Sequence, residues 1–351
     1  MLTSRQRLWR RFWHAVVPLD ALQSGPQPFR LLGEDIVLFL DRDGQPTALK
    51  DRCRHRTAKL SKGWCKDGEI VCGYHGWQYD RTGRLTCIPQ LESNRPLPDE
   101  GVRAYPCQAR YGYVWVALGD PVQPIFDIPE DSDPAYRRVP QFYQTWATSP
   151  LRLMENSFDN AHFSFVHRGT FGDLQQPKPG RYSIEETEAG FYAEATTHAL
   201  NPPTAHRVTG CTEPAIDRLL RSTWYLPFGR RFDMQFPSGI RHIIISHATP
   251  IDDGNIQLVQ FLYRNDKETD CPATLLVDWD ARIIAEDKDV LESTDPDVTL
   301  DVRDVDEIHM PSDRPSLIMR KRLLALLRQH GETEITTRVG ASIPQMQSAA
   351  G

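Results

Sequence analysis

The sequence predicts an α+β protein with an all-β domain first and then a domain in which helices cover a curved antiparallel sheet. Short runs of Val, Ile, Leu and Phe, broken by Gly-containing turns, continue to about residue 118 and are typical of antiparallel strands. The segment "GDPVQPIFDIPEDSDP" then combines four prolines with several acids, which is typical of a domain boundary. Further strand-like segments precede two segments with helical periodicity. We therefore predict domains at residues 1–120 and 121–330.

The second domain is predicted element by element from its periodicity. The segment "LRLMENSFDNAHFSFVH" carries apolar residues at mixed three- and four-residue spacing, as a helix packed on a core does. Two further helices are predicted over residues 272–294 and 316–331. The residues after them lack helical periodicity, so we predict that 331–351 form a mobile tail. Strands of one curved sheet are predicted at 181–197, 221–229, 231–237, 241–251 and 256–264.

Composition excludes several classes of protein. A chain of 351 residues with 40% hydrophobic content can bury a large core, and a net charge of −6 offers no general basis for binding nucleic acid or an anionic membrane. No run approaches the roughly 18 apolar residues of a membrane span, and the first residues lack the apolar core of a signal peptide. Seven irregularly spaced cysteines do not suggest a disulfide framework. We expect a cytoplasmic protein that acts on a small molecule or a protein partner.

Four residues in the stretch "DRCRHRTAKLSKGWCKDGEIVCGYHGWQYD" have the types and spacing of metal ligands. Cys53 and His55 are one residue apart, Cys72 and His75 are two apart, and sixteen residues separate the pairs. Each pair follows a strand-like run, and nearby glycines permit tight turns. Two thiolates and two imidazoles suit a structural zinc ion, and they equally suit a [2Fe–2S] cluster with cysteines on one iron and histidines on the other.

The residues around the ligands favour the cluster. "CRHR" followed by "CGYHGWQYD" resembles the Rieske signature, in which Cys-x-His precedes Cys-x-x-His-Gly-Trp. The resemblance implies that Cys53 and Cys72 hold the buried ferric iron, and that His55 and His75 hold the outer iron, which passes the electron on. Imidazole ligands raise the reduction potential above that of all-cysteine clusters.

A second set of metal ligands is suggested further along the chain. In "MENSFDNAHFSFVHRGTFG", Asp159, His162 and His167 follow at spacings of three and five. Asp159 and His162 would share a helical face, whereas His167 lies about 140° around the helix from His162. The helix must therefore end or loosen before His167 if both histidines are to bind one ion.

A carboxylate in the segment "DARIIAEDKDVLEST" completes this set. Asp287 projects from the middle of an apolar stripe formed by Ile283, Ile284, Val290 and Leu291, where Glu286 and Asp289 fit less well. A carboxylate in such a place is costly unless it is paired or bound to metal. Two imidazoles and one carboxylate form the facial triad of non-haem iron oxygenases, which leaves coordination positions open for O₂.

Together, the two metal motifs resemble the terminal oxygenase of the Rieske non-haem iron family, over residues 10 to about 330. That family carries Asn-x-x-Asp-x-x-His-x4-His and a distant Asp. Here Asn156 and Asp159 match the Asn and Asp, His162 and His167 match the iron histidines, and Asp287 matches the late carboxylate. The resemblance implies a helix-grip, START-like catalytic domain, one [2Fe–2S] cluster, one mononuclear Fe(II), and O₂ as co-substrate.

The resemblance also implies a homotrimer. In this family the cluster of one subunit faces the mononuclear iron of the next, and the carboxylate at the position of Asp159 connects cluster His75 of one chain with iron His162 of its neighbour. The sequence contains no dinucleotide fingerprint and no ferredoxin-type cysteine run. Electrons must therefore come from a separate NAD(P)H-dependent reductase with flavin and an iron–sulfur centre, with a ferredoxin as a further candidate partner.

The branch of the family is indicated by departures near the cluster. "HRTAKLSKG", with Thr57, differs from the "HRG" usual in ring dihydroxylases and resembles the monooxygenase and demethylase branch, as do "MENSFD" and "AEDKDVLES". That branch includes methylxanthine N-demethylases, aryl O-demethylases and oxygenases of chlorophyll metabolism. We therefore expect hydroxylation or oxidative demethylation of a small aromatic or heterocyclic substrate. The alternatives are a cis-dihydroxylating dioxygenase and an electron-transfer protein with a non-catalytic second domain.

Aromatic residues near the iron motif are candidates for substrate contacts. Phe165 and Phe171 flank the second iron histidine, and Trp224 lies on a predicted strand of the sheet. An aromatic wall suits a flat, hydrophobic ligand held by few polar groups.

Overall fold

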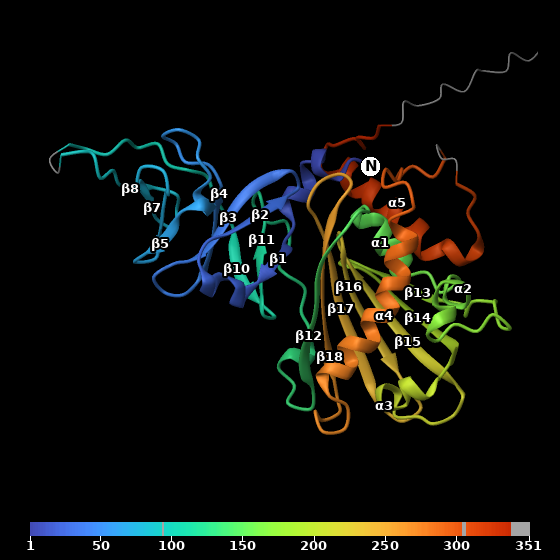
Figure 1. Ribbon diagram of the computed structural model, residues 1–351. Helices are drawn as coiled ribbons and strands as arrows, with labels where there is room; N and C mark the ends of the chain where they lie inside the picture. The colour runs from blue at the N-terminus through green and yellow to red at the C-terminus, as the bar shows by residue number, and fades with distance from the viewer. Residues whose placement is uncertain (93–94, 304–306, 338–351) are drawn as a thin grey trace, which may run out of the picture.

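Two unequal parts make up the molecule. The computed structural model describes residues 1–92, 95–303 and 307–337. In this part of the chain the strands up to Val116 form three small antiparallel sheets, and the strands from Arg137 onward form one seven-stranded antiparallel sheet. Figure 1 shows the small sheets on one side and the large sheet, with α4 and α1 against it, on the other. The predicted α+β class is confirmed.

The small sheets bury two cores by alternation along their strands. In β3, Ile36 and Leu38 join the core shared with the large sheet, whereas Val37 and Phe39 face the core beneath the cysteine and histidine loops. Successive side chains of a strand point to opposite faces, so one strand serves both cores. The sheet orders are β1-β11-β10, β2-β3-β4-β9 and β5-β6-β7-β8. The strands are β1 His14–Pro18, β2 Gln27–Leu31, β3 Glu34–Leu40, β4 Pro46–Lys50, β5 Trp64–Lys66, β6 Glu69–Val71, β7 Gln78–Tyr79, β8 Leu85–Cys87, β9 Ala104–Tyr105, β10 Cys107–Arg110 and β11 Tyr113–Val116.

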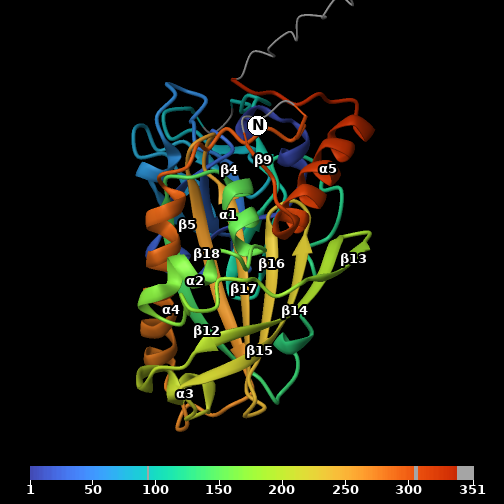
Figure 2. The ribbon, with the colours of Figure 1, turned by 90° about the vertical axis from the view of Figure 1, so that its right-hand side faces the viewer.

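The large sheet has the order β12-β18-β17-β16-β15-β14-β13 and curves around the helices (Figure 2). Its first strand, β12, lies outside the predicted strands because only three of its ten residues are buried and it contains Pro140. Proline is tolerated at a bulge on an edge strand, and the register of β12 shifts there. The strands are β12 Arg137–Trp146, β13 Ser183–Thr187, β14 Gly190–Leu200, β15 Ala215–Tyr225, β16 Gly229–Gln235, β17 Arg241–Pro250 and β18 Ile256–Arg264.

The helices position the candidate site. The expected helix at 150–170 is divided: α1 (Pro150–Ser157) begins at the N-cap Ser149 and ends before Phe158, and α2 (Phe163–Val166) follows. The helix ends before His167, as expected, but the chain also leaves the helix at residues 158–162, so Asp159 and His162 do not share a helical face. α4 (Ala273–Leu291) contacts α1, α2, α3 and β12, while α5 (Arg314–Gln329) packs on α1 and β14. The short helices are α3 His206–Thr209, η1 Thr3–Arg5, η2 Leu8–Arg11, η3 Leu19–Ser24, η4 Leu60–Lys62, η5 Pro129–Asp131, η6 His167–Gly169, η7 Pro203–Ala205 and η8 Pro311–Asp313.

The two ends of the described chain meet beside α5. The amide of Leu2 donates to the carbonyl of Ile335, and Thr337 donates to the carboxylate of Asp297. These contacts involve the first residues of the predicted tail, whereas residues 338–351 of that prediction lie outside the described residues. None of the helices in the described ranges combines the length and the apolar character that crossing a bilayer requires.

Candidate active site

Two loops of the same design hold the cysteine and histidine pairs. In the first loop the amide of Thr57 donates to the carbonyl of Cys53 over 3.0 Å, and in the second the amide of Gly76 donates to that of Cys72 over 2.9 Å. Both donors have positive φ, 59° at Thr57 and 74° at Gly76. Glycine adopts this conformation without cost, whereas a β-branched threonine is strained by it. Each ligand pair is thus fixed by backbone turns at the end of a strand.

The four donor atoms fit two metal ions better than one. The cysteines are buried, while His55 is exposed and its Nδ1 lies 3.1 Å from Nδ1 of His75. Two nitrogens at that separation can share an ion. A single tetrahedral ion would bring all four donors to roughly 4 Å of one another, yet among the described residues no three of these side chains bring their donor atoms within 4.8 Å. Burial raises the pKa of the Cys72 thiol, so a thiolate there needs a cation beside it.

The predicted iron ligands converge between α2 and α4. Nε2 of His162 and Nε2 of His167 lie 3.5 and 3.4 Å from Oδ1 of Asp287, and the three donor atoms all lie within 4.8 Å of one another. His162 is the residue before α2 and His167 the residue after it, while Asp287 lies near the end of α4. The arrangement can hold one cation on one face.

Further polar contacts orient each ligand. Nδ1 of His162 lies 3.2 Å from Oδ2 of Asp159, and Nδ1 of His167 lies 3.0 Å from Oε2 of Glu286. Asn156 donates to Oδ1 of Asp287 over 3.3 Å. An imidazole that donates its Nδ1–H to a carboxylate presents Nε2 as an acceptor, and such contacts also raise ligand basicity. The predicted Asn156 and Asp159 thus lie directly behind the ligands.

The charge of the site favours a cation. Burial lowers the pKa of His162, but the hydrogen bonds with Asp159 and Asp287 outweigh it and raise the pKa to about 9. Burial raises the pKa of the Asp287 carboxyl, but the hydrogen bond with His162 and the nearby imidazoles of His167 and His162 outweigh it and hold that pKa below its usual range. A proton on His162 therefore balances these carboxylates in the absence of metal, and a divalent cation would displace it.

Glu286 makes contacts with the iron site that the sequence pattern does not predict. It fits the apolar stripe of its helix less well than Asp287, yet consecutive helical residues are only about 100° apart. From there its carboxylate reaches both Nδ1 of His167 and the Thr170 hydroxyl, the latter over 2.8 Å. The adjacent acids in "AEDKD" are the only sequence signal, and they do not say which histidine each acid contacts.

A mainly apolar cavity of about 110 Å³ opens beside the three ligands. Of the predicted substrate contacts, Phe171 lines it. Phe165 does not: it is 53% exposed, because two residues along a helix from the lining residue Phe163 lead to the opposite face. Trp224 is buried in the core against Phe191 and donates to the Pro227 carbonyl over 3.0 Å. The predictions for Phe165 and Trp224 are corrected accordingly.

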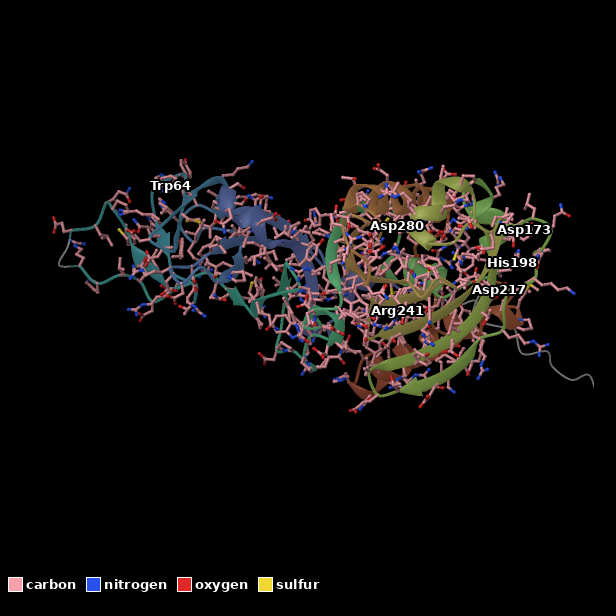
Figure 3. All side chains as sticks on the ribbon, turned by 90° about the horizontal axis from the view of Figure 1, so that it is seen from below. Trp64, Asp173, His198, Asp217, Arg241 and Asp280 are labelled. Carbon is pink, nitrogen blue, oxygen red and sulfur yellow. The ribbon has the colours of Figure 1, made fainter. Side chains whose placement is uncertain are left out.

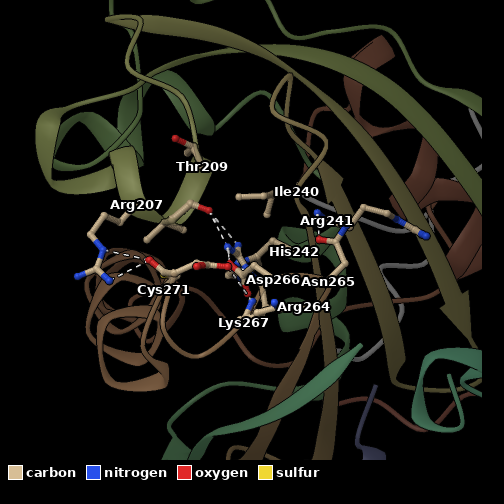
Figure 4. Close-up of polar contacts among 12 residues, drawn as sticks. Arg207, Thr209, Ile240, Arg241, His242, Arg264, Asn265, Asp266, Lys267 and Cys271 are labelled. Atoms are coloured by element: carbon tan, nitrogen blue, oxygen red, sulfur yellow. Dashed lines mark hydrogen bonds and ion pairs between the residues drawn. The ribbon is translucent and has the colours of Figure 1, made fainter. Parts of the chain in front are cut away.

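A polar network with satisfied hydrogen bonds lines part of the cavity. Arg264 donates to Nδ1 of His242 over 3.0 Å, so Nε2–H of His242 donates to Asp280, which also accepts from Gln141. Arg264 itself is held by the Val208 carbonyl and by Asp266 (Figure 4). Figure 3 shows Asp280 within the large domain, remote from Trp64 of the small one. The network has few free donors or acceptors for a ligand.

Comparison with protein families assigns both parts of the chain. Residues 12–106 match the Rieske [2Fe-2S] domain family, and residues 146–329 match the vanillate O-demethylase oxygenase C-terminal domain family. The second match alone covers more than half of the chain.

Individual relatives agree in length and fold. Methylxanthine N1-demethylase NdmA of Pseudomonas putida is 28% identical over 99% of this chain and 97% of the relative, and methylxanthine N3-demethylase NdmB of the same species is 27% identical over 89% and 88%. The structure of NdmA with caffeine superposes with a TM-score of 0.81 over 94% of each chain. Dicamba monooxygenase bound to dicamba, 22% identical over 92% of this chain and 98% of its own, shares the fold with a TM-score of 0.78.

Proposed function

Because this chain belongs to the Rieske non-haem iron oxygenases with a catalytic domain of the vanillate O-demethylase type, we propose that it demethylates a small aromatic or heterocyclic compound. It is an O₂-dependent oxygenase whose cofactors are a Rieske [2Fe–2S] cluster and a mononuclear iron. The observation that carries the proposal is the placement of His162, His167 and Asp287 at the wall of a mainly apolar cavity of about 110 Å³.

We assign the site residues by the chemistry of their donor atoms. Cys53 and Cys72 would hold one iron of the cluster, and His55 and His75 the other. At the second site His162, His167 and Asp287 would hold the iron, whose chemistry when bound is O₂ activation. Two distances support the assignment: the Nδ1 atoms of His55 and His75 lie 3.1 Å apart, and the donor atoms of His162, His167 and Asp287 all lie within 4.8 Å of one another.

The surrounding residues orient the proposed iron ligands and exclude water from the cavity. Asp159 and Glu286 hold the two iron histidines with Nε2 directed at Asp287, and Asn156 fixes one oxygen of that carboxylate. Phe163 and Phe171 face the cavity and keep water from the methyl group of a bound substrate.

The overall reaction balances with electrons from a reductase. One oxygen atom of O₂ enters a C–H bond of the methyl group, and the other leaves as water after two electrons and two protons arrive. The hydroxymethyl product then releases formaldehyde, and the proton goes to the oxygen or nitrogen of the demethylated substrate. The family relationship implies a reductase partner. A ferredoxin as an additional carrier is part of our proposal.

We propose that electrons cross between subunits of a homotrimer. In one chain the cluster loops lie at the end of the small domain away from α2 and α4 (Figures 1 and 3). Asp159 keeps 29% of its side chain exposed while it contacts His162, so its carboxylate remains accessible to His75 of a neighbouring chain.

The free thiols of the described chain agree with a reducing cytoplasm as its location. The domain division at residue 120 and the tail from 331 belong to the same proposal.

The test is reconstitution with a surrogate reductase and a panel of O-methyl and N-methyl aromatic compounds. We expect one formaldehyde for each NAD(P)H oxidised in a coupled reaction, and one labelled oxygen atom from ¹⁸O₂ in the formaldehyde. A cis-diol product that carries both atoms of O₂ would contradict demethylation and indicate ring dihydroxylation instead. Reduction of the cluster without O₂ consumption on any substrate would instead indicate an electron carrier.

A further inference from the structure

The wall of the cavity contains a buried arginine without a partner. Arg218 on β15 is 6% exposed, and its Nε makes no hydrogen bond to any described residue. Burial alone shifts its pKa, which falls to about 10, so no charged group among the described residues offsets the guanidinium. A cation buried without a counter-charge is strongly unfavourable.

Other buried arginines of the same chain show what a satisfied guanidinium requires. Arg264 is fully buried, donates to the Val208 carbonyl and to His242, and pairs with Asp266. Arg320 is 2% exposed and pairs with both Glu155 and Glu307. Arg218 therefore departs from the way this protein treats a buried charge.

The nearest acid in the sequence cannot serve Arg218. Asp217 is the preceding residue on the same strand, and successive side chains of a strand point to opposite faces. Its carboxylate lies 3.3 Å from Nδ1 of His198, which is its direct cross-strand neighbour. Figure 3 shows Asp217, His198 and Asp173 grouped together at one edge of the large domain. Arg218 faces the other side, toward the cavity.

Aromatic rings flank the guanidinium and connect it to the iron site. Cζ of Arg218 lies 4.3 Å from the ring centroid of Phe171 and 5.9 Å from that of Phe163. The Phe171 ring in turn lies 4.6 Å from the ring of His167. Cation–π contacts of this kind are weaker than the penalty for burying a charge, so they do not offset it. One aromatic ring thus separates an uncompensated cation from an iron ligand.

A second cation, Arg230 on β16, raises the positive potential of the cavity. Its Nε also lacks a hydrogen-bond partner among the described residues, and its guanidinium stacks 3.9 Å from the ring centroid of Phe232. Asp287 attracts Arg230 electrostatically, so this cation belongs to the iron site. Arg218 has no such neighbour and is the one left for a ligand.

We propose that Arg218 receives the carboxylate of a single-ring aromatic acid, with the methyl-bearing group of that acid directed at the iron ligands. A planar guanidinium binds a carboxylate through two parallel hydrogen bonds, and the low dielectric of an apolar cavity strengthens them. The cavity of about 110 Å³ is smaller than the roughly 150 Å³ of one that binds benzene, which favours a single ring over a fused system. The inference deepens the proposed function, on which it rests for the group that faces the iron.

Binding to the oxidised holoenzyme without reductase tests the inference independently of turnover. The probes are 4-methoxybenzoate, the neutral amide 4-methoxybenzamide and the tetrahedral anion 4-methoxybenzenesulfonate, each measured by isothermal titration calorimetry. We expect the wild type to bind the benzoate at least about tenfold more tightly than the amide, and more tightly than the sulfonate. Equal affinity for benzoate and amide would overturn the proposal without any variant. A preference for sulfonate would overturn the assignment to carboxylates.

Variants then locate the preference. Arg218→Met should reduce the benzoate-to-amide ratio to about one, whereas Arg218→Lys keeps the charge and should retain part of it. The matched control is Arg221→Met, since Arg221 lies on the same strand, faces the other side of the sheet and pairs with Glu194. A full benzoate preference in folded Arg218→Met, checked by circular dichroism and iron content, would overturn the proposal. If Arg218→Met does not fold, Arg218→Lys becomes the test. An unchanged benzoate-to-amide ratio in Arg218→Lys would overturn the proposed pair of hydrogen bonds from the guanidinium to the carboxylate.

The outcomes separate this inference from the demethylation. Preferential binding of the benzoate with no formaldehyde from any substrate would retain the anion subsite and remove the proposed reaction. Formaldehyde from neutral heterocycles, with no preference for acids, would retain the reaction and remove the subsite.

Discussion

The two metal-binding regions of this chain are built in opposite ways. The proposed cluster ligands come from two neighbouring loops, and backbone hydrogen bonds with positive φ at Thr57 and Gly76 define their geometry. The proposed iron ligands come from the two ends of α2 and from α4, far apart in sequence, and the side chains of Asp159 and Glu286 orient the two histidines. The first region should therefore depend on its metal for folding, whereas the second should tolerate metal loss.

The largest expected difference concerns the removal of a ligand. Cys72→Ser should abolish the visible absorption of the cluster and destabilise the small domain by several kcal/mol, because Cys72 lies in the core beneath both loops. Asp287→Ala should leave the cluster spectrum intact and change the free energy of unfolding by no more than about 2 kcal/mol. Thermal unfolding with absorption spectroscopy compares the two. Equal destabilisation would contradict the contrast.

The next effect concerns the route of electrons between the regions. Asp159→Asn keeps the shape of the side chain but removes the charge that contacts His162. We expect both metals to remain bound and coupled turnover to be lost, as measured by product formed per NAD(P)H. Normal activity in that variant would remove Asp159 from the electron route.

A smaller effect is expected at Glu286. Glu286→Gln should weaken iron binding by about 10- to 100-fold, because its amide no longer accepts the Nδ1–H of His167 as strongly. Competition with a chelator measures the affinity. Asp289→Asn, on the same helix and exposed, serves as the matched control and should bind iron as the wild type does.

A histidine pair between the small and the large domain predicts that the stability of the fold decreases in acid. His14 of β1 and His247 of β17 are buried together, with Nδ1 of His14 3.4 Å from Nε2 of His247, and burial lowers the pKa of His14 to about 4. The folded state thus binds fewer protons than the unfolded chain, so stability is complete above about pH 6.5 and falls as pH drops toward 4, by on the order of 3 kcal/mol for His14. Chemical denaturation at pH 7.5 and 5 measures this. A flat profile would contradict it.

The smallest effect compares the two cluster loops. Thr57→Gly relieves a side chain with φ of 59° and should stabilise the small domain by up to about 1 kcal/mol. Gly76→Ala should do the opposite, because its Cβ would lie 3.1 Å from Cγ of Pro89 and φ is positive there. Melting of the cluster absorption compares the two variants. Destabilisation by Thr57→Gly would show that the loop needs the threonine side chain.

The same difference explains what the sequence could predict. The cluster motif is local, so spacing and flanking glycines suffice to recognise it, and the apolar stripe of α4 identifies Asp287 because burial of a carboxylate has a cost. The contact of Glu286 with His167 depends on how α4 meets α2, which no periodicity encodes. The lack of a counter-charge for Arg218 is also a property of the tertiary structure, because it depends on how far the acidic side chains of the described residues lie from its guanidinium. Phe165 lies beside the iron motif in the sequence but points away from the cavity, because two residues along α2 separate it from the lining residue Phe163.

The most direct test of the two-centre account is the iron and acid-labile sulfide content of the purified chain, measured beside Asp287→Ala. The account predicts about three irons and two sulfides per wild-type chain, and about two irons and two sulfides in the variant. Two irons in both proteins, or zinc in place of iron, would contradict it.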